Sequence, residues 1–393
     1  MDWETHARRL AADTVRRESR WHEPLATVPR HLFVPRWWAN EGGRWTLRNG
    51  PAAPEPWMQA AYTDRTLVTR VGPLHADDAE PGTAITAGLP TSSSTLPGLV
   101  VTMYRHAVIP DGADVLVTTG SGYGTALACR RLGDKHVTSI DVDPALVEKA
   151  GNRLAAARLH PQTAVCDITG PLPGEYDRIV STVSVRCVPA SWLAALRPGG
   201  RLVTTIARTG LIVTADKSED GGAVGRVALD AAGFMATRHG DDYPPGLDDL
   251  YEQAKTTEGE DVNTGRYPVL YVPDAWDVWS MLELAVPGIE HRRRDDGEQR
   301  TVWLLHPDGS WARAEGRWTD PPTVHQSGPR RLWDELERVR HRLNREGTLP
   351  VYGAQVRIDP DGTMHLKRGG WSAVINGAPP PAPRASSCSA SPR

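Results

Sequence analysis

The sequence predicts a doubly wound α/β fold with a parallel sheet, preceded by a helical segment and followed by a small α+β domain. Two observations support this prediction. From about residue 114 to 240, short apolar runs alternate with amphipathic helical patterns, and such alternation is typical of parallel βαβ units. Beyond residue 265 the pattern changes to paired short strands around a single helix. We therefore divide the chain into an N-terminal helical segment (1–75), an α/β core (76–245) and a C-terminal α+β domain (246–376).

The composition argues against several classes of protein. The 393 residues include 45 basic and 48 acidic side chains, spread along the chain, so we expect no nucleic-acid partner. No run approaches the ~18 apolar residues of a membrane span, and no signal-peptide pattern opens the chain, so we expect a cytoplasmic protein without a membrane partner. The four cysteines have no CxxC spacing and the 13 histidines form no HExxH motif, so we predict no metal site.

The N-terminal segment begins with a predicted amphipathic helix, in which Trp3, Leu10 and Val15 recur at helical spacing. It leads to residues 28–35, Val-Pro-Arg-His-Leu-Phe-Val-Pro. The two prolines limit any regular element there to a short piece.

The core elements follow in order. Residues 115–117 form a predicted strand that runs into a glycine-rich loop and a helix ending near Leu132. Residues 137–140 form a second strand, after which Asp143 is the expected N-cap and Pro144 the first residue of a helix. Further strands are predicted at 178–180 and 202–206, the latter introduced by a turn at 197–200.

The C-terminal part has turn signals of another kind. Pro-Asp-Gly at 307–309 and again at 360–362 separates strand-type runs, so each predicts a hairpin. Between them, residues 332–343 have helical periodicity, and Gly347 is the expected end of that helix. Residues 377–393 are rich in proline and serine and predict a disordered tail.

A glycine-rich loop and an acidic residue suggest a nucleotide-like ligand. Residues 120–123, Gly-Ser-Gly-Tyr, lie between a strand and a helix, where missing side chains let a ligand approach the backbone. Asp141 ends the next strand, the position from which a carboxylate accepts hydrogen bonds from two ribose hydroxyls. Thr125 stands where a dinucleotide fold has its third glycine, which disfavours NAD. Asp167 ends a third strand and is either an acceptor for an adenine amino group or an ordinary loop residue.

Four motifs, in the same order, resemble the protein-L-isoaspartate O-methyltransferase family. They are residues 28–35, Ala-Tyr-Thr-Asp at 61–64, the loop at 120–123 and Arg-Pro-Gly-Gly-Arg-Leu at 197–202. The resemblance covers about residues 1–240. It implies a Rossmann-like methyltransferase core, S-adenosylmethionine as methyl donor, S-adenosylhomocysteine as product and a peptide carboxylate as acceptor. The cofactor contacts that it implies come from Gly120, Ser121, Gly122, Tyr123, Asp141, Val142, Asp167 and Ile168.

The chain departs from the family pattern in two places. Leu116 and Thr118 stand where the family has an acidic residue and a first glycine. The family's substrate motif Ser-Ala-Pro-His corresponds here to residues 92–97, Ser-Ser-Ser-Thr-Leu-Pro, with Thr95 in place of the serine.

The Ser/Thr run supplies the candidate catalytic residues. We expect Thr95 and Ser94 to donate hydrogen bonds to the acceptor carboxylate, and Ser92, Ser93 and Arg186 to lie on the substrate side. The plainer alternatives are a loop linker for the Ser/Thr run and a solvated position for Arg186.

The Ser/Thr run and stretches within residues 266–334 are similar to a branch of this family associated with ribosomally made peptides, the lanthipeptides and the ATP-grasp-ligated graspetides. The resemblance implies that the acceptor is an aspartate of a ring-bearing precursor peptide, whose methyl ester closes to an aspartimide. It also implies an ATP-grasp ligase as a pathway partner, and we expect the C-terminal domain to recognise the peptide.

Three functions stay open at this point. The first is a peptide-specific aspartyl O-methyltransferase, and the second is a general isoaspartyl repair enzyme. The third is a non-catalytic peptide-binding module, which Leu116 and Thr118 suggest because they alter the cofactor motif.

Overall fold

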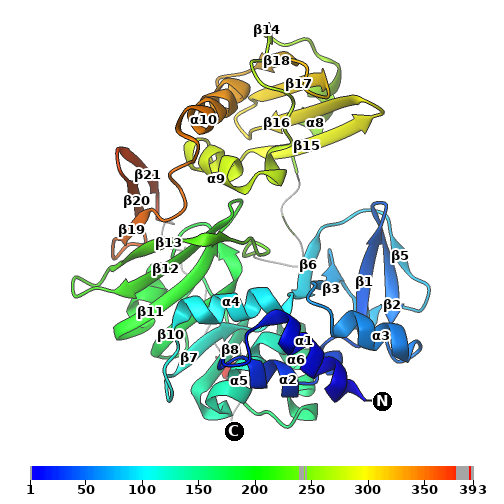
Figure 1. The fold of residues 1–393 in the computed structure, drawn as a ribbon, viewed down its shortest axis with the longest axis vertical. Coiled ribbons are helices and arrows are strands. Elements are labelled where there is room, and N and C mark those ends of the chain that lie inside the picture. Colours follow the sequence, from blue (N-terminus) through cyan, green and yellow to red (C-terminus); the bar gives the residue numbers. More distant parts are fainter. Residues whose placement is uncertain (1, 239–242, 244–245, 378–388, 391–393) are drawn as a thin grey trace.

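The computed structural model describes residues 2–238, 243, 246–377 and 389–390. Its strands form an eleven-stranded core sheet, a six-stranded N-terminal sheet and a five-stranded sheet in a second unit, which we define as residues 248–346 (Figure 1). The predicted disordered tail at 377–393 falls almost entirely outside the described residues. Ser389–Ala390 (β22) pairs with the edge of the core sheet at β9.

The central part of the core sheet is parallel, with strand order β11-β10-β7-β8-β9. The strands are β7 (Val115–Thr118), β8 (Val137–Asp141), β9 (Gln162–Val165), β10 (Tyr176–Val185) and β11 (Leu196–Ile206). The connecting elements are α4 (Pro97–Ala107), α5 (Tyr123–Leu132), η3 (Asp134–His136), α6 (Pro144–Ala156) and α7 (Ala190–Ala195). The predicted strand–helix alternation is confirmed.

Both faces of the parallel sheet are buried. In β7, Val115 and Val117 belong to the hydrophobic cluster that includes α4 and α5, whereas Leu116 belongs to the cluster that includes Trp192 of α7. Because successive side chains of a strand point to opposite faces, a strand covered on both sides is apolar at every position. This pattern explains why the run at 115–117 is continuously apolar.

The predicted helix start after β8 is confirmed by its cap. Asp143 precedes α6, and its side chain accepts a hydrogen bond from the Ala145 amide at 2.9 Å. The turn predicted at 197–200 lies within β11, where it shifts the register against β10 between the Tyr176 and Arg178 pairs.

Antiparallel strands extend the core sheet beyond β11. They are β12 (Leu211–Lys217), β13 (Ala223–Ala231), β19 (Gln355–Ile358), β20 (Met364–Arg368) and β21 (Trp371–Ile375). The hairpin predicted at 360–362 is therefore present, but it pairs with β13 of the core sheet. The range 246–376, which we assigned to one C-terminal domain, thus contains both the second unit and three strands of the core. Turn signals locate a hairpin but do not say which sheet edge it joins.

The N-terminal part of the chain up to Ser94, predicted as helical over residues 1–75, contains a sheet as well as helices, and η2, β5 and β6 lie beyond residue 75. Its helices are α1 (Trp3–Thr14), α2 (His22–Thr27), η1 (Arg30–Phe33), α3 (Pro54–Ala61) and η2 (Ala76–Asp78). Its strands are β1 (Arg36–Glu41), β2 (Arg44–Asn49), β3 (Leu67–Val71), β4 (Leu74–His75), β5 (Ala84–Ile85) and β6 (Pro90–Ser94). The helical prediction missed the β1–β2 hairpin, whose Gly42-Gly43 turn has positive φ at both residues. A Gly-Gly pair between two short strands is a hairpin signal.

The second unit packs helices on a sheet of order β14-β18-β17-β16-β15. Its elements are α8 (Asp248–Thr256), β14 (Asp261–Thr264), η4 (Val272–Asp274), α9 (Trp276–Ala285), β15 (Glu290–Asp296), β16 (Gln299–Leu305), β17 (Trp311–Arg317), β18 (Thr323–Ser327) and α10 (Leu332–Glu346). The hairpin predicted at 307–309 and the helix that ends at Gly347 are confirmed.

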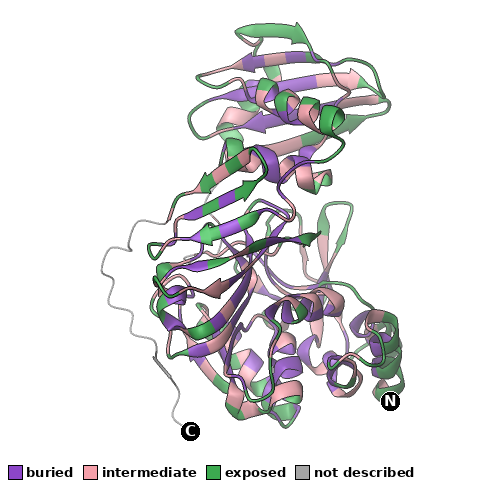
Figure 2. Ribbon diagram, turned by 60° about the vertical axis from the view of Figure 1, so that its left-hand side comes forward, coloured by how far each residue is buried: buried purple, intermediate pink, exposed green. Residues whose placement is uncertain are grey.

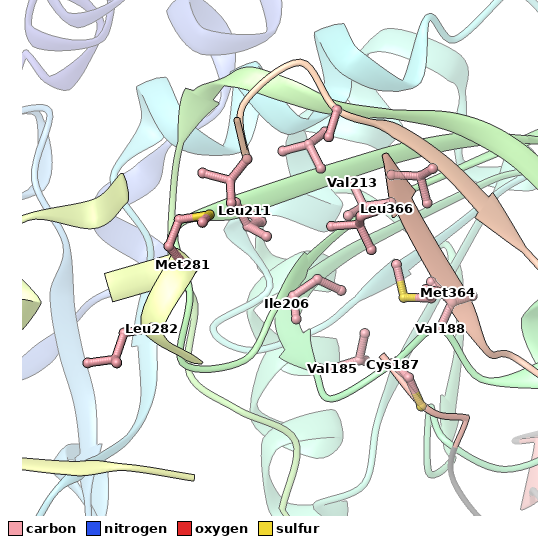
Figure 3. Close-up of a cluster of buried hydrophobic side chains, with 14 of the residues drawn as sticks. Val185, Cys187, Val188, Ile206, Leu211, Val213, Met281, Leu282, Met364 and Leu366 are labelled. Atoms are coloured by element: carbon pink, nitrogen blue, oxygen red, sulfur yellow. The ribbon is translucent and has the colours of Figure 1, made fainter. Parts of the chain in front are cut away.

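One hydrophobic cluster joins the core sheet to the second unit. Met281 and Leu282 of α9 lie in the same cluster as Leu211 of β12 and Leu366 of β20, and all four are buried (Figure 3). Buried residues alternate with intermediate and exposed ones along the antiparallel core strands near this junction (Figure 2). The second unit is thus packed against the core by a shared apolar interior.

Candidate functional site

A cavity of about 230 Å³ lies at the carboxyl ends of the parallel strands, where α/β sheets bind their ligands. The glycine loop, the strand ends of β8 and β9, the Ser/Thr run and a segment after β13 form its walls. Most of the predicted site residues line this one cavity: Ser92, Ser93, Thr95, Gly120, Ser121, Tyr123, Asp141, Val142, Asp167 and Ile168. The structure therefore brings together the predicted cofactor side and the predicted acceptor side.

Gly122 belongs to the glycine loop but does not line the cavity. Its φ of +89° is one that L side chains rarely adopt, and an added Cβ would lie 3.1 Å from the Cβ of Ala150 and 3.3 Å from Phe33. The absence of a side chain thus lets the loop turn tightly into α5 against α6.

Asp141 lies at the end of β8 and faces the loop. Its carboxylate accepts hydrogen bonds from the amides of Gly120 and Asp143, both at 3.1 Å. Burial raises the pKa of Asp141 to about 6, while the two amide hydrogen bonds act in the opposite direction. Above that pH the side chain is a carboxylate at the cavity wall, able to accept further hydrogen bonds from hydroxyl groups.

The two departures from the family's cofactor motif lie in different environments. Leu116 is fully buried in the core and does not line the cavity. Thr118 lines the cavity, and its hydroxyl is held by the hydroxyl of Thr182 at 2.7 Å and the Thr182 amide at 2.9 Å. Its side chain is therefore fixed against β10.

Most of the Ser/Thr run lies in strand β6 and is therefore not a loop linker. Ser93 and Ser94 pair with Val68 and Leu67 of β3, and Thr95 follows directly. Ser94 is 1% exposed, does not line the cavity, and its hydroxyl has no hydrogen-bond partner among the described residues. Ser92, Ser93 and Thr95 line the cavity, whereas Ser94 does not. The structure therefore does not place Ser94 with the other residues expected at the acceptor.

Arg30 connects the Thr95 loop to the rest of the site. Its buried guanidinium donates hydrogen bonds to the backbone carbonyls of Thr95 at 3.2 Å and Ser94 at 3.3 Å. It also lies 5.3 Å from the ring centre of Tyr123 in the glycine loop. Burial lowers the pKa of Arg30 to about 10, so the side chain is charged at neutral pH. Sequence reasoning did not identify this role, because the acceptor carbonyls are distant in the chain.

Arg186, expected on the substrate side, does not line the cavity. It is exposed after the end of β10, while Thr182 and Val183 line the cavity in its place. Burial raises the pKa of Glu283 in α9 to about 7, and the charge of Arg186 acts in the opposite direction, which places Arg186 toward the second unit. The solvated alternative describes this residue better.

Sequence reasoning missed one wall of the cavity. Residues 233–238, which we call the cavity wall segment, follow β13 and all line the cavity. Ser184 of β10 holds them: its amide donates to the Met235 carbonyl at 2.8 Å, and its carbonyl accepts from the Thr237 amide at 2.9 Å. No motif in the sequence marks this segment.

Residues 51–235 match the sequence profile of the family described as Protein-L-isoaspartate(D-aspartate) O-methyltransferase (PCMT). This part of the chain, somewhat less than half of its 393 residues, is similar to the protein-L-isoaspartate O-methyltransferase family. The matched range includes the Ser/Thr run, the glycine loop, Asp141 and the start of the cavity wall segment. It ends before the second unit.

Individual proteins of the same description are similar to this chain. The Protein-L-isoaspartate O-methyltransferase of Anaeromyxobacter dehalogenans is 33% identical over 115 residues, which are 28% of this chain and 54% of the relative. Protein-L-isoaspartate O-methyltransferase 2 of Archaeoglobus fulgidus is 26% identical over 231 residues, 56% of this chain and 88% of the relative. The chain spans about half the length of the Anaeromyxobacter relative that it matches.

Solved structures of the same description are also similar. One protein-L-isoaspartate O-methyltransferase covers 95% of this chain and 98% of its own length, with 18% identity and a TM-score of 0.48. A second, from Plasmodium falciparum in complex with S-adenosyl-L-homocysteine, covers 61% of this chain and 99% of its own, with 13% identity and a TM-score of 0.43.

Among the described residues, no group of three His, Cys, Asp or Glu side chains is arranged to hold a metal ion. No helix in the described part of the chain is both long and apolar enough to cross a membrane.

Proposed function

We propose that this protein is an S-adenosylmethionine-dependent O-methyltransferase that esterifies the side-chain carboxylate of an aspartate in a peptide. One observation carries the proposal. A single cavity, largely within the range that matches the protein-L-isoaspartate O-methyltransferase profile, has the glycine loop and Asp141 on one side and Thr95 on the other.

The residues of the cavity fit the cofactor. Gly120 has a φ of +50°, which favours glycine, and its backbone lies close to the Ser93 carbonyl, since an added Cβ would lie 3.4 Å from that oxygen. The Asp141 carboxylate is available to ribose hydroxyls, and Asp167 and Ile168 lie at the next strand end, where an adenine would be held. Bound here, S-adenosylmethionine supplies an electrophilic methyl group on a positively charged sulfur.

The chain's own task is to position the acceptor. An aspartate side chain has an ordinary pKa of about 3.9 and is ionised at neutral pH, so no general base is needed. Thr95 donates a hydrogen bond to one carboxylate oxygen and leaves the other facing the methyl group. Arg30 fixes the loop that carries Thr95, and Leu96, Leu99 and Val100 give that side of the cavity an apolar lining. Orientation of this kind is a major source of rate enhancement in bimolecular transfers.

The finer proposal is that the acceptor is an aspartate of a ring-bearing, ribosomally made peptide of the graspetide type, with an ATP-grasp ligase acting earlier on the same peptide. The amide nitrogen of the following residue attacks the ester carbonyl, forms a C–N bond and expels methoxide, which leaves as methanol with the amide proton. The product is an aspartimide. Support comes from the second unit, which lies outside the matched range of 51–235, and from Thr95 in the acceptor motif.

The second candidate is a general isoaspartyl repair enzyme. The family match favours it, because the relatives are named protein-L-isoaspartate O-methyltransferases. The two candidates share the cavity and differ in the acceptor.

Mass spectrometry with three synthetic peptides of one sequence separates the candidates. They are a linear isoaspartyl peptide, a linear aspartyl peptide and an aspartyl peptide closed by a Thr–Glu side-chain ester, each incubated with S-adenosylmethionine. Methyl ester formation followed by a net loss of one water on the ring-bearing peptide alone supports peptide maturation. Turnover of the isoaspartyl peptide alone establishes repair. If no peptide is methylated and calorimetry detects no binding of S-adenosylhomocysteine, both enzymatic candidates are overturned. The non-catalytic peptide-binding module is then the remaining candidate.

A further inference from the structure

Trp276, at the start of α9 in the second unit, packs on two glycines of the core. A Cβ added to Gly233 would lie 3.1 Å from Cζ3 of Trp276, and one added to Gly210 would overlap Cε3 of the same ring. Neither glycine has a positive φ, so it is space, and not backbone conformation, that favours glycine at both positions. The indole fits because both side chains are missing.

A hydrogen-bonded contact fixes α9 at the same place. The Ser280 hydroxyl accepts a hydrogen bond from the Gly210 amide at 2.9 Å and donates one to the Trp276 carbonyl at 2.6 Å. The Gly210 carbonyl in turn accepts from the Ala232 amide at 3.1 Å. Ser280 is fully buried. The first turn of α9, the start of β12 and the end of β13 are therefore held together.

Gly233 is also the first residue of the cavity wall segment. From there the segment runs beside Ser184, whose hydroxyl donates to the Phe234 carbonyl at 2.9 Å and lies 3.1 Å from the Phe234 amide. It ends at Arg238, whose guanidinium lies 3.8 Å from the Asp143 carboxylate. The amide of Asp143 is one of the two that hold Asp141. One continuous set of contacts thus leads from Trp276 to the carboxylate on the cofactor side.

We propose that Trp276 is a positioning residue for methyl transfer, through which the second unit fixes the cavity wall segment and with it the cofactor side of the cavity. The inference rests on the proposed S-adenosylmethionine-dependent activity and extends it, because it makes the second unit part of the cofactor site. Removal of the indole leaves space beside Gly233, and the wall segment loses its support at that end.

The test compares three full-length variants by calorimetric titration with S-adenosylhomocysteine and by methyl-transfer kinetics. Trp276→Ala is expected to weaken binding by about tenfold, equivalent to ~1.4 kcal/mol, and to raise KM for S-adenosylmethionine more than it lowers kcat. Trp276→Phe retains an aromatic ring and is expected to recover most of the affinity. Trp318→Ala is the matched control, because Trp318 also belongs to the second unit and is 76% exposed. We expect it to behave as the wild type.

A double-mutant cycle with Gly233→Ala tests the contact itself. In the wild-type background the new methyl group meets the Trp276 ring and is expected to weaken binding, whereas in the Trp276→Ala background it meets open space and should add no further loss. Additive losses, or a folded Trp276→Ala variant with wild-type affinity and KM, overturn the role of Trp276. A wild-type protein that does not bind S-adenosylhomocysteine instead overturns the proposed function, so the two failures are distinguishable.

Discussion

The guanidinium of Arg30 and the backbone carbonyl oxygen of Thr95 lie 3.2 Å apart, although 65 residues separate them in the chain. The same guanidinium donates to the carbonyls of Ala61 at 2.9 Å and Arg65 at 2.8 Å. One buried side chain therefore ties two loops to each other and sets the position of the proposed acceptor hydroxyl.

Replacing Arg30 by methionine removes these hydrogen bonds and keeps most of the apolar volume. The carbonyls lose a charged donor in a buried place, so we expect the free energy of unfolding to fall by about 3 kcal/mol. Arg30→Lys keeps the charge without the branched donor geometry and should lie between the two. Urea unfolding followed by circular dichroism measures the effect. An Arg30→Met variant as stable as the wild type would contradict the anchoring role.

Thr95 and Ser94 should differ in their effect on catalysis. Thr95→Val removes the hydroxyl with little change in volume and is expected to lower kcat by about 10- to 100-fold, as for other oriented hydrogen-bond donors. Thr95→Ser should retain most of the activity. Ser94→Ala is the control, since the Ser94 hydroxyl lies outside the cavity. Single-turnover methyl transfer measures both, and equal losses at the two positions would rule out the assignment to Thr95.

Cofactor binding should depend on pH through Asp141. Burial raises the pKa of this carboxyl above its ordinary value, to about 6. Above that pH the ionised carboxylate accepts hydrogen bonds from the ribose, and as the pH falls through about 6 the group takes up a proton. We therefore expect affinity for S-adenosylhomocysteine to be full on the alkaline side and to fall on the acid side. Calorimetry on both sides of this pH tests it. Asp141→Asn should flatten the profile, and a flat wild-type profile would refute the prediction.

Gly122 and Gly133 allow a matched test of the glycine loop. Both have a φ near +90°, but only at Gly122 would an added Cβ approach neighbouring atoms, whereas the space beside Gly133 is open. Alanine at either position strains the backbone and should cost about 1 kcal/mol of stability. We expect Gly122→Ala alone to abolish S-adenosylhomocysteine binding in addition, because the loop must move away from α6. Equal binding by the two variants would show that the loop tolerates displacement.

The parts of the fold that the sequence predicts well are those whose signals are local. The apolar run at 115–117, the glycine loop and the Asp143 cap each depend on neighbouring residues, and all three are present as expected. The β1–β2 hairpin was missed because tryptophan and charged side chains share its strands, which hides the alternation.

The parts of the site that the sequence does not predict depend on contacts between distant residues. The cavity wall segment is held by Ser184, 50 residues before Phe234. The buried position of Ser94 outside the cavity depends on the pairing of β6 with β3, which no motif records. The location of Arg186 near α9 likewise depends on how the second unit packs.

The last three strands at one end of the core sheet, β19, β20 and β21, follow the second unit in the sequence. Because β19 pairs with β13, shortening the protein at residue 245 would remove β19, β20 and β21 together with the second unit. It would also leave β13 as an unpaired edge and expose Leu211, which packs in the same cluster as Met281 in the intact protein. Unpaired edges and uncovered apolar faces recruit strands from other molecules. The second unit is therefore an insertion between strands of the core sheet, and the two are expected to be acquired or lost together.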